Sequence, residues 1–327
     1  MKKIDLVYLW VDGNDPAHRA KKNRALAGLG RPAPKWTDEP AKDDYEELKY
    51  SLRSVEKFAP WINHIYIVTD GHRPAWLNAD NPKVTIVDHA EIIPKDLLPT
   101  FNSNMIEFFI YKIPGLSEHF LYANDDMFFG KPVEPDFFFD ETGNPIVIMG
   151  RKKWPKSYYT GATSFSKFGL YKKTCANALK YAYDKTGVKF PYSFKHAIEP
   201  FRKSYFKENI EKDFEFWKKT TFTPFREVTN VQRIVLTFLD NAKNRNKIVG
   251  TCTVDGRRTT PRAQLDLYYI MNHLRGRLQV DNISLYRVGW LVQPTTFCVN
   301  STWALNSFKL NHGAMNKLFP NKSGFEK

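Results

Sequence analysis

Four short apolar runs, each followed within two residues by an aspartate, limit what this chain can fold into more than any other feature of its sequence. Their β-branched and aromatic residues are typical of buried strands. Between the runs, apolar residues recur at helical spacing in 43–58, and a second helix is expected over 104–112. Strands that alternate with helices predict an α/β fold with a mostly parallel sheet. The runs span 4–11, 62–69, 83–87 and 120–123, and the aspartates are Asp12, Asp70, Asp88 and Asp125.

The fourth run ends in Asn124-Asp125-Asp126, which puts two adjacent carboxylates and a carboxamide at a strand end. In open α/β sheets, ligands bind in the crevice outside the carboxyl ends of the strands. Carboxylates at such a place suit a hard divalent cation, Mg²⁺ or Mn²⁺, which would in turn hold phosphate oxygens. Asn and Asp are also the commonest turn residues, so an ordinary turn after the strand is the alternative interpretation.

Further polar residues are expected at the same edge of the sheet. Asp12 follows the first run directly and is a second candidate for the site, whereas Asp70 and Asp88 are interpreted as turn residues or as supports for ligands. Asn102 or Ser103 is expected to cap the second helix, at a position that can face a phosphate. An ordinary cap would need no ligand.

Size and composition are those of a folded protein with a substantial core. The 327 residues suffice for one large α/β domain or two smaller ones. No run of 18 apolar residues occurs and the start lacks the apolar stretch of a signal peptide, so we expect the chain to stay in the cytosol. The three cysteines are far apart, which predicts neither a disulfide framework nor a zinc site. Residues 17–42 are polar and contain three prolines, which predicts a mobile, irregular segment.

Charge divides the chain into two unlike parts. Residues 1–150 hold 17 Lys/Arg and 23 Asp/Glu, a net charge of −6, whereas residues 151–327 hold 32 and 12, a net charge of +20. A part this basic suggests a polyanionic partner such as nucleic acid, an anionic membrane surface or a phosphate-bearing substrate. We expect an α/β half over 1–150, a basic and mainly helical region over 151–275 that packs over the mouth of the sheet, and a β–α segment over 276–327 that completes the core.

Several sequence blocks together resemble a known family. They are IDLVYLWVDGNDP at 4–16, ELKYSLRSV at 47–55, LPTFNS at 98–103, NDD at 124–126, KH at 195–196, FR at 225–226, FCVN at 297–300 and LFPNKSGFE at 318–326. These blocks resemble the Stealth family of sugar-phosphate transferases, which includes bacterial capsule polysaccharide phosphotransferases and the catalytic subunit of the lysosomal-enzyme N-acetylglucosamine-1-phosphotransferase. The similarity spans nearly the whole chain. One departure is Ser301, where the family usually has an aspartate.

The resemblance implies transfer of an intact sugar-1-phosphate from a nucleotide-sugar, UDP-linked such as UDP-N-acetylhexosamine, to a hydroxyl of a growing glycan. The nucleoside monophosphate would leave. It also implies a Rossmann-like sheet similar to that of the GT-A nucleotide-sugar transferases, with donor binding in 1–150 and acceptor binding in 151–275. The expected acceptor is an anionic or lipid-linked glycan, met at the cytoplasmic face of the inner membrane. Nucleic acid is not an expected partner, because no nucleic-acid-binding motif occurs.

Phosphoryl-type transfer needs in-line positioning and charge neutralisation more than covalent chemistry, and each candidate residue fits one of these tasks. His196 is the expected general base because imidazole titrates near the working pH. Arg226 would stabilise phosphate charge with its forked donors. Arg53 could support the same task or only brace a carboxylate near its helix. The full set is His196, Asp12 and Arg226 as catalytic residues, Asn102, Ser103, Arg53 and Asn124 as donor-binding residues, and Asp125 and Asp126 as metal ligands.

Two other functions account for parts of the sequence. A metal-dependent GT-A-type glycosyltransferase would use the same acidic strand ends, cleave at the anomeric carbon and release a nucleoside diphosphate. A non-catalytic polyanion-binding protein would explain the basic charge and the interleaved aromatic residues, but it leaves the acidic strand ends without a purpose. The nucleotide that is released distinguishes the first alternative, and substitution of Asp125 and Asp126 tests the second.

Overall fold

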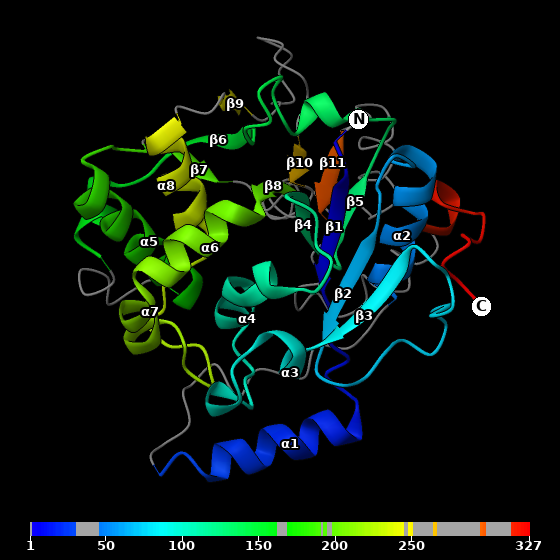
Figure 1. Cartoon of the computed structure of the whole chain (residues 1–327), viewed down its shortest axis with the longest axis horizontal. Coiled ribbons are helices and arrows are strands. Elements are labelled where there is room, and N and C mark those ends of the chain that lie inside the picture. Colours follow the sequence, from blue (N-terminus) through cyan, green and yellow to red (C-terminus); the bar gives the residue numbers. More distant parts are fainter. Residues whose placement is uncertain are drawn as a thin grey trace, which may run out of the picture.

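The computed structural model describes residues 2–30, 46–161, 169–190, 192–194, 198–244, 248–250, 264–266, 295–298 and 315–327 (Figure 1). The main sheet has the strand order β3 (Val84–Asp88), β2 (Ile65–Thr69), β1 (Ile4–Leu9), β4 (His119–Asn124) and β8 (Glu199–Arg202). The helices are α1 (Pro16–Ala27), α2 (Glu47–Phe58), α3 (His89–Ile92), α4 (Ser103–Phe109), α5 (Leu170–Thr186), α6 (Lys203–Lys212), α7 (Phe214–Thr220) and α8 (Ile234–Asn244).

The four apolar runs of the sequence form the four parallel strands of the main sheet. Strand β1 pairs in parallel with β2 on one side and with β4 on the other, and β3 extends the sheet beyond β2. Among the described strands of this sheet, β8 alone runs antiparallel, at the edge beside β4. The prediction of an α/β fold with a mostly parallel sheet is therefore confirmed. The carboxyl ends of β1 to β4 consequently lie along one edge of the sheet.

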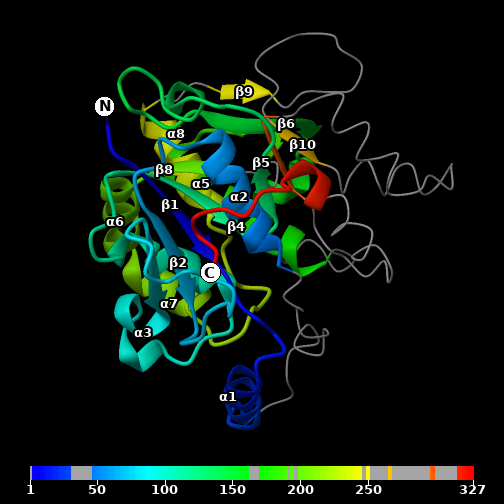
Figure 2. The same cartoon turned by 90° about the vertical axis from the view of Figure 1, so that its right-hand side faces the viewer.

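Both faces of this sheet are buried, because successive side chains of each strand point to opposite sides. Val7 on β1 and Tyr122 on β4 belong to the hydrophobic cluster that also contains residues of α4 to α8. Leu6 and Tyr8 belong to a second cluster, which they share with the apolar side of α2. Figures 1 and 2 show α2 on one side of the sheet and α4 to α8 on the other. None of the described helices is both long and apolar enough to cross a bilayer.

Two smaller sheets connect distant parts of the chain. Strand β5 (Met127–Phe129), directly after the acidic pair, pairs with β11 (Thr296–Cys298), which also pairs with β10 (Gln264–Asp266). Strand β6 (Val147–Lys153) pairs with β7 (Tyr192–Phe194) and β9 (Ile248–Gly250). The β-like sequence at 296–299 thus forms a strand at 296–298. Since β8 lies in the main sheet, residues of the basic region also contribute to the core; the three-part division of the chain stays a prediction.

The expectation of an irregular segment over 17–42 is wrong for its first part, because residues 16–27 form helix α1. Asp15 is its N-cap, with a side chain that accepts a hydrogen bond from the His18 backbone N–H at 2.7 Å, and Pro16 occupies the first turn, where a proline is well tolerated. The helix has no buried residue, so it lacks the apolar stripe by which helices are recognised in sequence. Residues 31–45 lie outside the described part of the chain.

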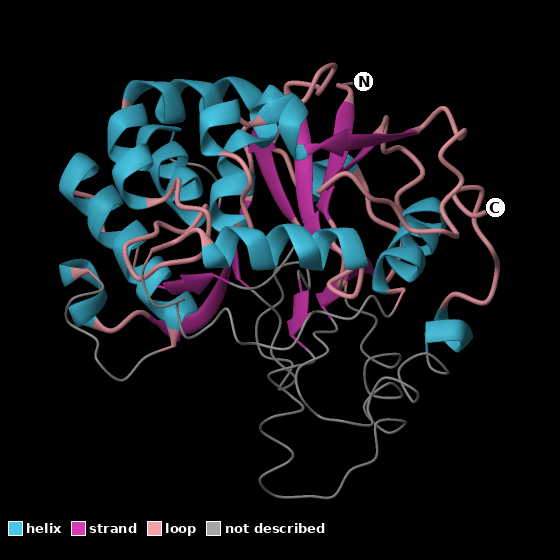
Figure 3. Cartoon of the chain, turned by 90° about the horizontal axis from the view of Figure 1, so that it is seen from below, coloured by secondary structure: helices cyan, strands magenta, loops and turns pink. Residues whose placement is uncertain are grey.

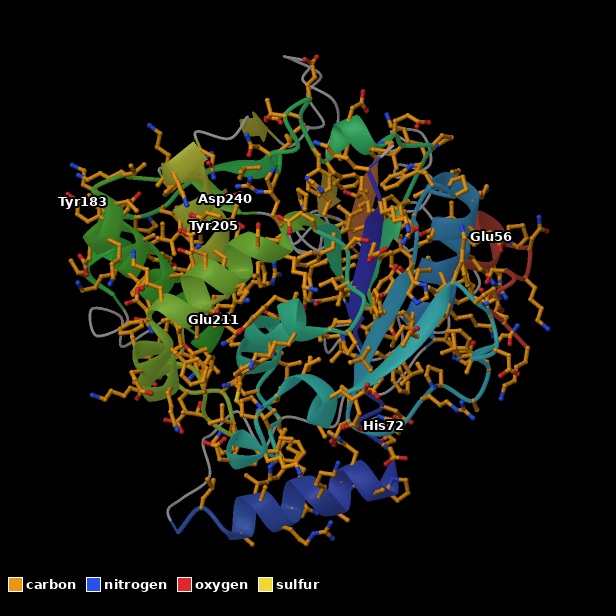
Figure 4. The ribbon with its side chains drawn as sticks, in the orientation of Figure 1. Glu56, His72, Tyr183, Tyr205, Glu211 and Asp240 are labelled. Atoms are coloured by element: carbon orange, nitrogen blue, oxygen red, sulfur yellow. The ribbon has the colours of Figure 1, made fainter. Side chains whose placement is uncertain are left out.

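The C-terminal segment is attached to α2 through Arg53. Its guanidinium donates two hydrogen bonds to the Glu326 carboxylate, at 2.8 and 2.7 Å, and a third to the Phe319 carbonyl at 2.9 Å. The side chains of Arg53 and Glu326 are only 11% and 2% exposed. Figure 4 labels Glu56, one turn further along α2, whose carboxylate accepts a hydrogen bond from the Gly324 backbone. The structure thus places Arg53 in the role of a brace for a carboxylate.

We predict that Arg53→Met lowers the free energy of unfolding by about 3–5 kcal/mol, because it leaves the buried Glu326 carboxylate without its cationic partner, while the Ser323 backbone N–H and hydroxyl still donate to it. The matched control is Lys57→Met on the same helix, where an exposed hydrogen bond to the Leu318 carbonyl and cation–π contacts with Phe58 and Phe319 are lost, and the expected change is about 1 kcal/mol. Urea denaturation measures both. Equal effects of the two substitutions would show that the bidentate pair does not anchor the C-terminal segment.

Candidate active site

The acidic pair lies in the tight turn between β4 and β5. Asp125 and Asp126 are 4% and 6% exposed, so both carboxylates are withdrawn from bulk water although they follow a strand end. Burial raises the pKa of the Tyr8 phenol, and the charge of Asp125 raises it further, which places this carboxylate near β1. The Tyr8 hydroxyl is 2.6 Å from the Ser51 hydroxyl of α2. Two adjacent buried carboxylates in a turn are more than turn formation requires.

A buried ionic network connects the end of β4 with α4. The Tyr122 hydroxyl lies 2.8 Å from the Asn124 side-chain oxygen and 3.1 Å from the Glu107 carboxylate of α4. Arg233, just before α8, donates hydrogen bonds to both Glu107 and Glu199, and its guanidinium lies 4.0 Å from the centre of the Tyr122 ring. These contacts hold three elements, α4, β4 and β8, at fixed positions relative to the acidic turn.

Asn102, Ser103 and Arg226 come together at the start of α4. Asn102 caps the helix and is fully buried; its side-chain NH₂ donates to the Thr221 carbonyl and to the Asn230 side chain, each at 3.0 Å. The Arg226 guanidinium donates a hydrogen bond to the Ser103 hydroxyl. The polar atoms of Asn102 are thus used inside the protein. Ser103, half-buried, and Arg226, exposed, are the members of this group that can reach a ligand.

Asp12 lies beside a group of histidines at the carboxyl ends of β1 and β2. Its backbone N–H donates to His72 Nε2 at 3.0 Å, and its side chain accepts from the Asn14 backbone at 2.8 Å. Figure 4 shows His72 between the lower end of the sheet and α1, and Figure 3 shows α1 crossing that end. A chain of ring contacts, with centroids 5.1–5.6 Å apart, connects this group to the loop that carries Arg226. It runs through Trp10, His72, His18, Phe101 and Phe225.

Asp70 holds α1 to the sheet. Its carboxylate accepts hydrogen bonds from His18 Nδ1, at 2.8 Å, and from the Lys21 ammonium group. Burial raises the pKa of Asp70, but the hydrogen bonds from His18 and Lys21 outweigh it and bring the pKa below its ordinary value. Asp88, at the end of β3, caps α3 in a capping box with Glu91. Asp70 thus supports α1 and Asp88 caps α3, whereas the sequence interpretation was of turn residues or supports for ligands.

His196 lies outside the described residues, and so does Ser301. Within the described part of the chain, no group of three or more His, Cys, Asp or Glu side chains is arranged to hold a metal ion. Mg²⁺ needs no such cage, because it is usually bound by one or two carboxylates together with water and substrate phosphates. The pair of Asp125 and Asp126 has the donor chemistry for that mode of binding.

Comparison with known proteins identifies the family. Residues 2–30 match conserved region 1 of Stealth proteins, and residues 41–147 match conserved region 2. The N-terminal half belongs to the Stealth family. Region 1 contains β1, Asp12 and α1, and region 2 contains α2, the Asn102-Ser103 pair and the acidic turn.

Two of the similar curated proteins are bacterial phosphotransferases. The chain is 48% identical over 145 residues to the capsular polysaccharide phosphotransferase WcwK of Streptococcus pneumoniae, an alignment that covers 44% of each protein. It is 39% identical over 236 residues to the exopolysaccharide phosphotransferase CpsY of Mycobacterium tuberculosis, covering 70% of this chain and 42% of CpsY. The chain therefore spans less than half of either relative.

Among solved structures, the galactosyltransferase LgtC in complex with donor and acceptor sugar analogues matches over 97% of this chain and 95% of its own, with a TM-score of 0.46 and 11% identity. The glycosyltransferase GlyE of Streptococcus pneumoniae matches with the same TM-score and identity over 96% of this chain and 60% of its own. At this level of similarity, neither structure bears on the chemistry of the candidate active site.

Sequence reasoning missed the residues that support the site. His18 and His72 follow no pattern in the sequence, and only the fold brings them to Asp12 and Asp70. One feature of the sequence could have identified Arg233. It is a single cation directly before the apolar start of α8, and a charge at such a position is either exposed or paired. Its exposure of 4% shows that it is paired.

We predict that His89, at the start of α3, stays neutral in the folded protein throughout pH 5–8. Burial lowers the pKa of His89 from 6.5 to about 4. The unfolded chain therefore binds a proton between pH 6.5 and 4 that the folded protein does not, and stability decreases as pH falls through this window, by roughly 3 kcal/mol in total. His89→Gln should remove this part of the pH dependence of urea denaturation. An NMR titration of the His89 ring that gives a pKa above 6 would contradict the prediction.

Proposed function

We propose that this protein transfers a sugar-1-phosphate from a nucleotide-sugar, UDP-linked such as UDP-N-acetylhexosamine, to a hydroxyl of a growing capsular or extracellular polysaccharide. The product would contain a new phosphodiester, and the nucleoside monophosphate would leave. Membership of the Stealth family and the names of the bacterial relatives support the reaction class. The observation that carries the proposal is the pair of almost fully buried carboxylates, Asp125 and Asp126, at the end of a central strand.

The proposed step is a displacement at phosphorus. The acceptor hydroxyl oxygen forms a bond to the sugar-bearing phosphorus of the donor, and the bond from that phosphorus to the bridging oxygen breaks. The hydroxyl proton passes to the proposed base, His196, and the bridging oxygen leaves on the nucleoside monophosphate. Because little covalent help is needed, most of the acceleration has to come from positioning and charge.

The site residues divide these tasks in the proposal. Asp125 and Asp126 would hold a divalent cation, Mg²⁺ or Mn²⁺, which when bound neutralises the charge on the donor diphosphate. The exposed Arg226, oriented by its hydrogen bond to Ser103, would contact a phosphate oxygen. Asp12 would bind the nucleotide or orient the acceptor hydroxyl. Arg53 is engaged with Glu326, and we assign it to stability rather than to the donor.

The acceptor in this proposal is an anionic or lipid-linked glycan. The basic half of the chain would attract it electrostatically, and peripheral contact at the cytoplasmic face of the inner membrane would bring a lipid-linked chain to the site. Surface attraction of this kind weakens as salt rises, because charges beyond about 8 Å are screened at physiological ionic strength.

The test is to identify the released nucleotide. The full chain is incubated with a panel of UDP- and GDP-sugars, a capsule oligosaccharide and Mg²⁺, and the products are separated by chromatography, with a chelator in a parallel reaction. We expect UMP or GMP, formed only with metal present. Release of UDP or GDP would contradict the proposal and indicate a glycosyltransferase.

We further predict that Asp125→Asn or Asp126→Asn lowers the rate of monophosphate release roughly 100-fold or more, because each removes one charge that the donor complex requires. Asp136→Asn is the matched control, since it is an exposed aspartate ten residues after the pair and should keep full activity. Melting temperatures of all three variants separate loss of chemistry from loss of folding. Unchanged release in both site variants would rule out the proposed role of the acidic turn.

A further inference from the structure

Helix α1 has an unusual inner face. Most helices on a protein surface pack an apolar stripe against the core, but α1 has no buried residue. Four of its positions, spaced as one helical face, line a cavity of about 510 Å³ instead of packing on the core. They are Lys21, Arg24, Ala25 and, at the C-cap, Gly28. Two cations and two small residues, with Leu29 directly after them, line this side and leave room beside the helix, and such a concave space is where ligands bind.

The opposite wall of the cavity is apolar and well fixed. It is formed by the segment before α4 and by the loop after α7. The Phe101 backbone N–H donates to the Pro224 carbonyl at 2.7 Å, which joins the two segments. Phe222 is buried, and Pro99 and Pro224 are exposed. The apolar lining residues of this wall are Leu97, Leu98, Pro99, Phe222 and Pro224.

The charges in the cavity leave Arg24 available for an anion. Lys21 is bound to Asp70, and Asp96 at the rim lies 3.4 Å from Lys218. Arg24 is exposed and has no ion-pair partner among the residues that the structure describes. Its guanidinium can bind a phosphate through two parallel hydrogen bonds. The cavity therefore presents one forked cation opposite an apolar wall.

The cavity adjoins the candidate active site. Two residues of its apolar wall, Pro99 and Pro224, lie a few positions before Ser103 and Arg226 in the chain. Ser103 and Arg226 are hydrogen-bonded to each other at the start of α4. On the cationic side, Lys21 pairs with Asp70, and Asp70 also pairs with His18. The His18 ring lies 5.4 Å from the Phe101 ring, centroid to centroid. A ligand that extends out of the active site along this edge would enter the space beneath α1.

We propose that the cavity beneath α1 is a subsite for a phosphodiester of the glycan acceptor, with the phosphate on Arg24 and the adjoining sugar against the leucine and proline wall. This rests on the proposed function, since it assigns a place to the acceptor of that reaction. A phosphate with a sugar on either side combines an anion with the apolar C–H faces of sugar rings, which matches the two walls. Such a subsite makes the enzyme prefer chains that already contain phosphodiesters, and so favours elongation.

Equilibrium binding to the full chain, without turnover, tests the proposal. The probe is a methyl glycoside of two N-acetylglucosamine units joined by a phosphodiester, and methyl chitobioside is its phosphate-free counterpart. We expect the phosphodiester to bind about tenfold more tightly than the neutral disaccharide, and Arg24→Ala to remove that preference. Arg19→Ala is the matched control, because Arg19 is an exposed cation on the same helix that does not line the cavity. Calorimetry measures both probes with the wild-type chain and with each of the two variants, six combinations in all.

A second variant tests the space rather than the charge. Ala25→Trp, which fills the cavity from α1, should abolish binding of the phosphodiester and leave UDP-N-acetylglucosamine binding unchanged. The proposal is overturned if the wild-type chain binds the phosphodiester no better than the neutral disaccharide, or if Arg24→Ala behaves like Arg19→Ala. It is also overturned if Arg24→Ala weakens UDP-N-acetylglucosamine instead, since the cavity would then belong to the donor. Because no nucleotide is released in this experiment, its result is independent of which nucleotide the product assay finds.

Discussion

The arrangement of the site depends on the parallel pairing of β1 between β2 and β4. Parallel neighbours place their carboxyl ends on the same side, so Asp12, Asp70 and the acidic turn after β4 meet at one edge although they are far apart in sequence. This pairing is stable because β1 is buried on both faces, with Leu6 and Tyr8 in one hydrophobic cluster and Val7 in the other. A shift of one residue in register would turn the side chains of each cluster to the opposite face of the sheet. The register is therefore strongly specified, and it fixes where each strand ends relative to its neighbours.

Buried charges then hold the elements that carry the site. Arg233 is paired with Glu107 and Glu199 and lies against Tyr122, so α4, β4 and β8 are connected through one guanidinium. Burial of an ion pair adds little net stability, but the loss of one partner costs several kcal/mol. Such a network therefore penalises any arrangement in which one of the three elements moves. The same reasoning applies to Asp70, which fixes α1 through His18 and Lys21 although the helix buries no apolar residue.

Local patterns account well for the strands and for α2 and α4, because the strands are short apolar runs, α2 has apolar residues at helical spacing and α4 has a clear N-cap in Asn102. The same patterns fail for α1, whose inner face lines a cavity and so lacks an apolar stripe. Arg53 was open between two roles, and contacts decide between them: its partner Glu326 is 273 residues away in sequence. The expected cap of α4 was Asn102 or Ser103, and the structure shows that it is Asn102. The second set of hydrogen bonds of Asn102, to Thr221 and Asn230, depends on a loop that no local pattern connects to it.

The sequence by itself determined the α/β class, the four buried strands and the presence of acidic residues at their ends, since these follow from short-range periodicity and from residue type. It also determined the family, because long motifs can be recognised without a structure. Only the tertiary structure decided which polar groups meet, namely Ser103 with Arg226 and Asp70 with Lys21 of α1. It also decided that Arg24 lines the cavity beneath α1. The physical reason is that hydrogen bonds and ion pairs act over a few ångströms in space, and the chain distances between these partners carry no local signal.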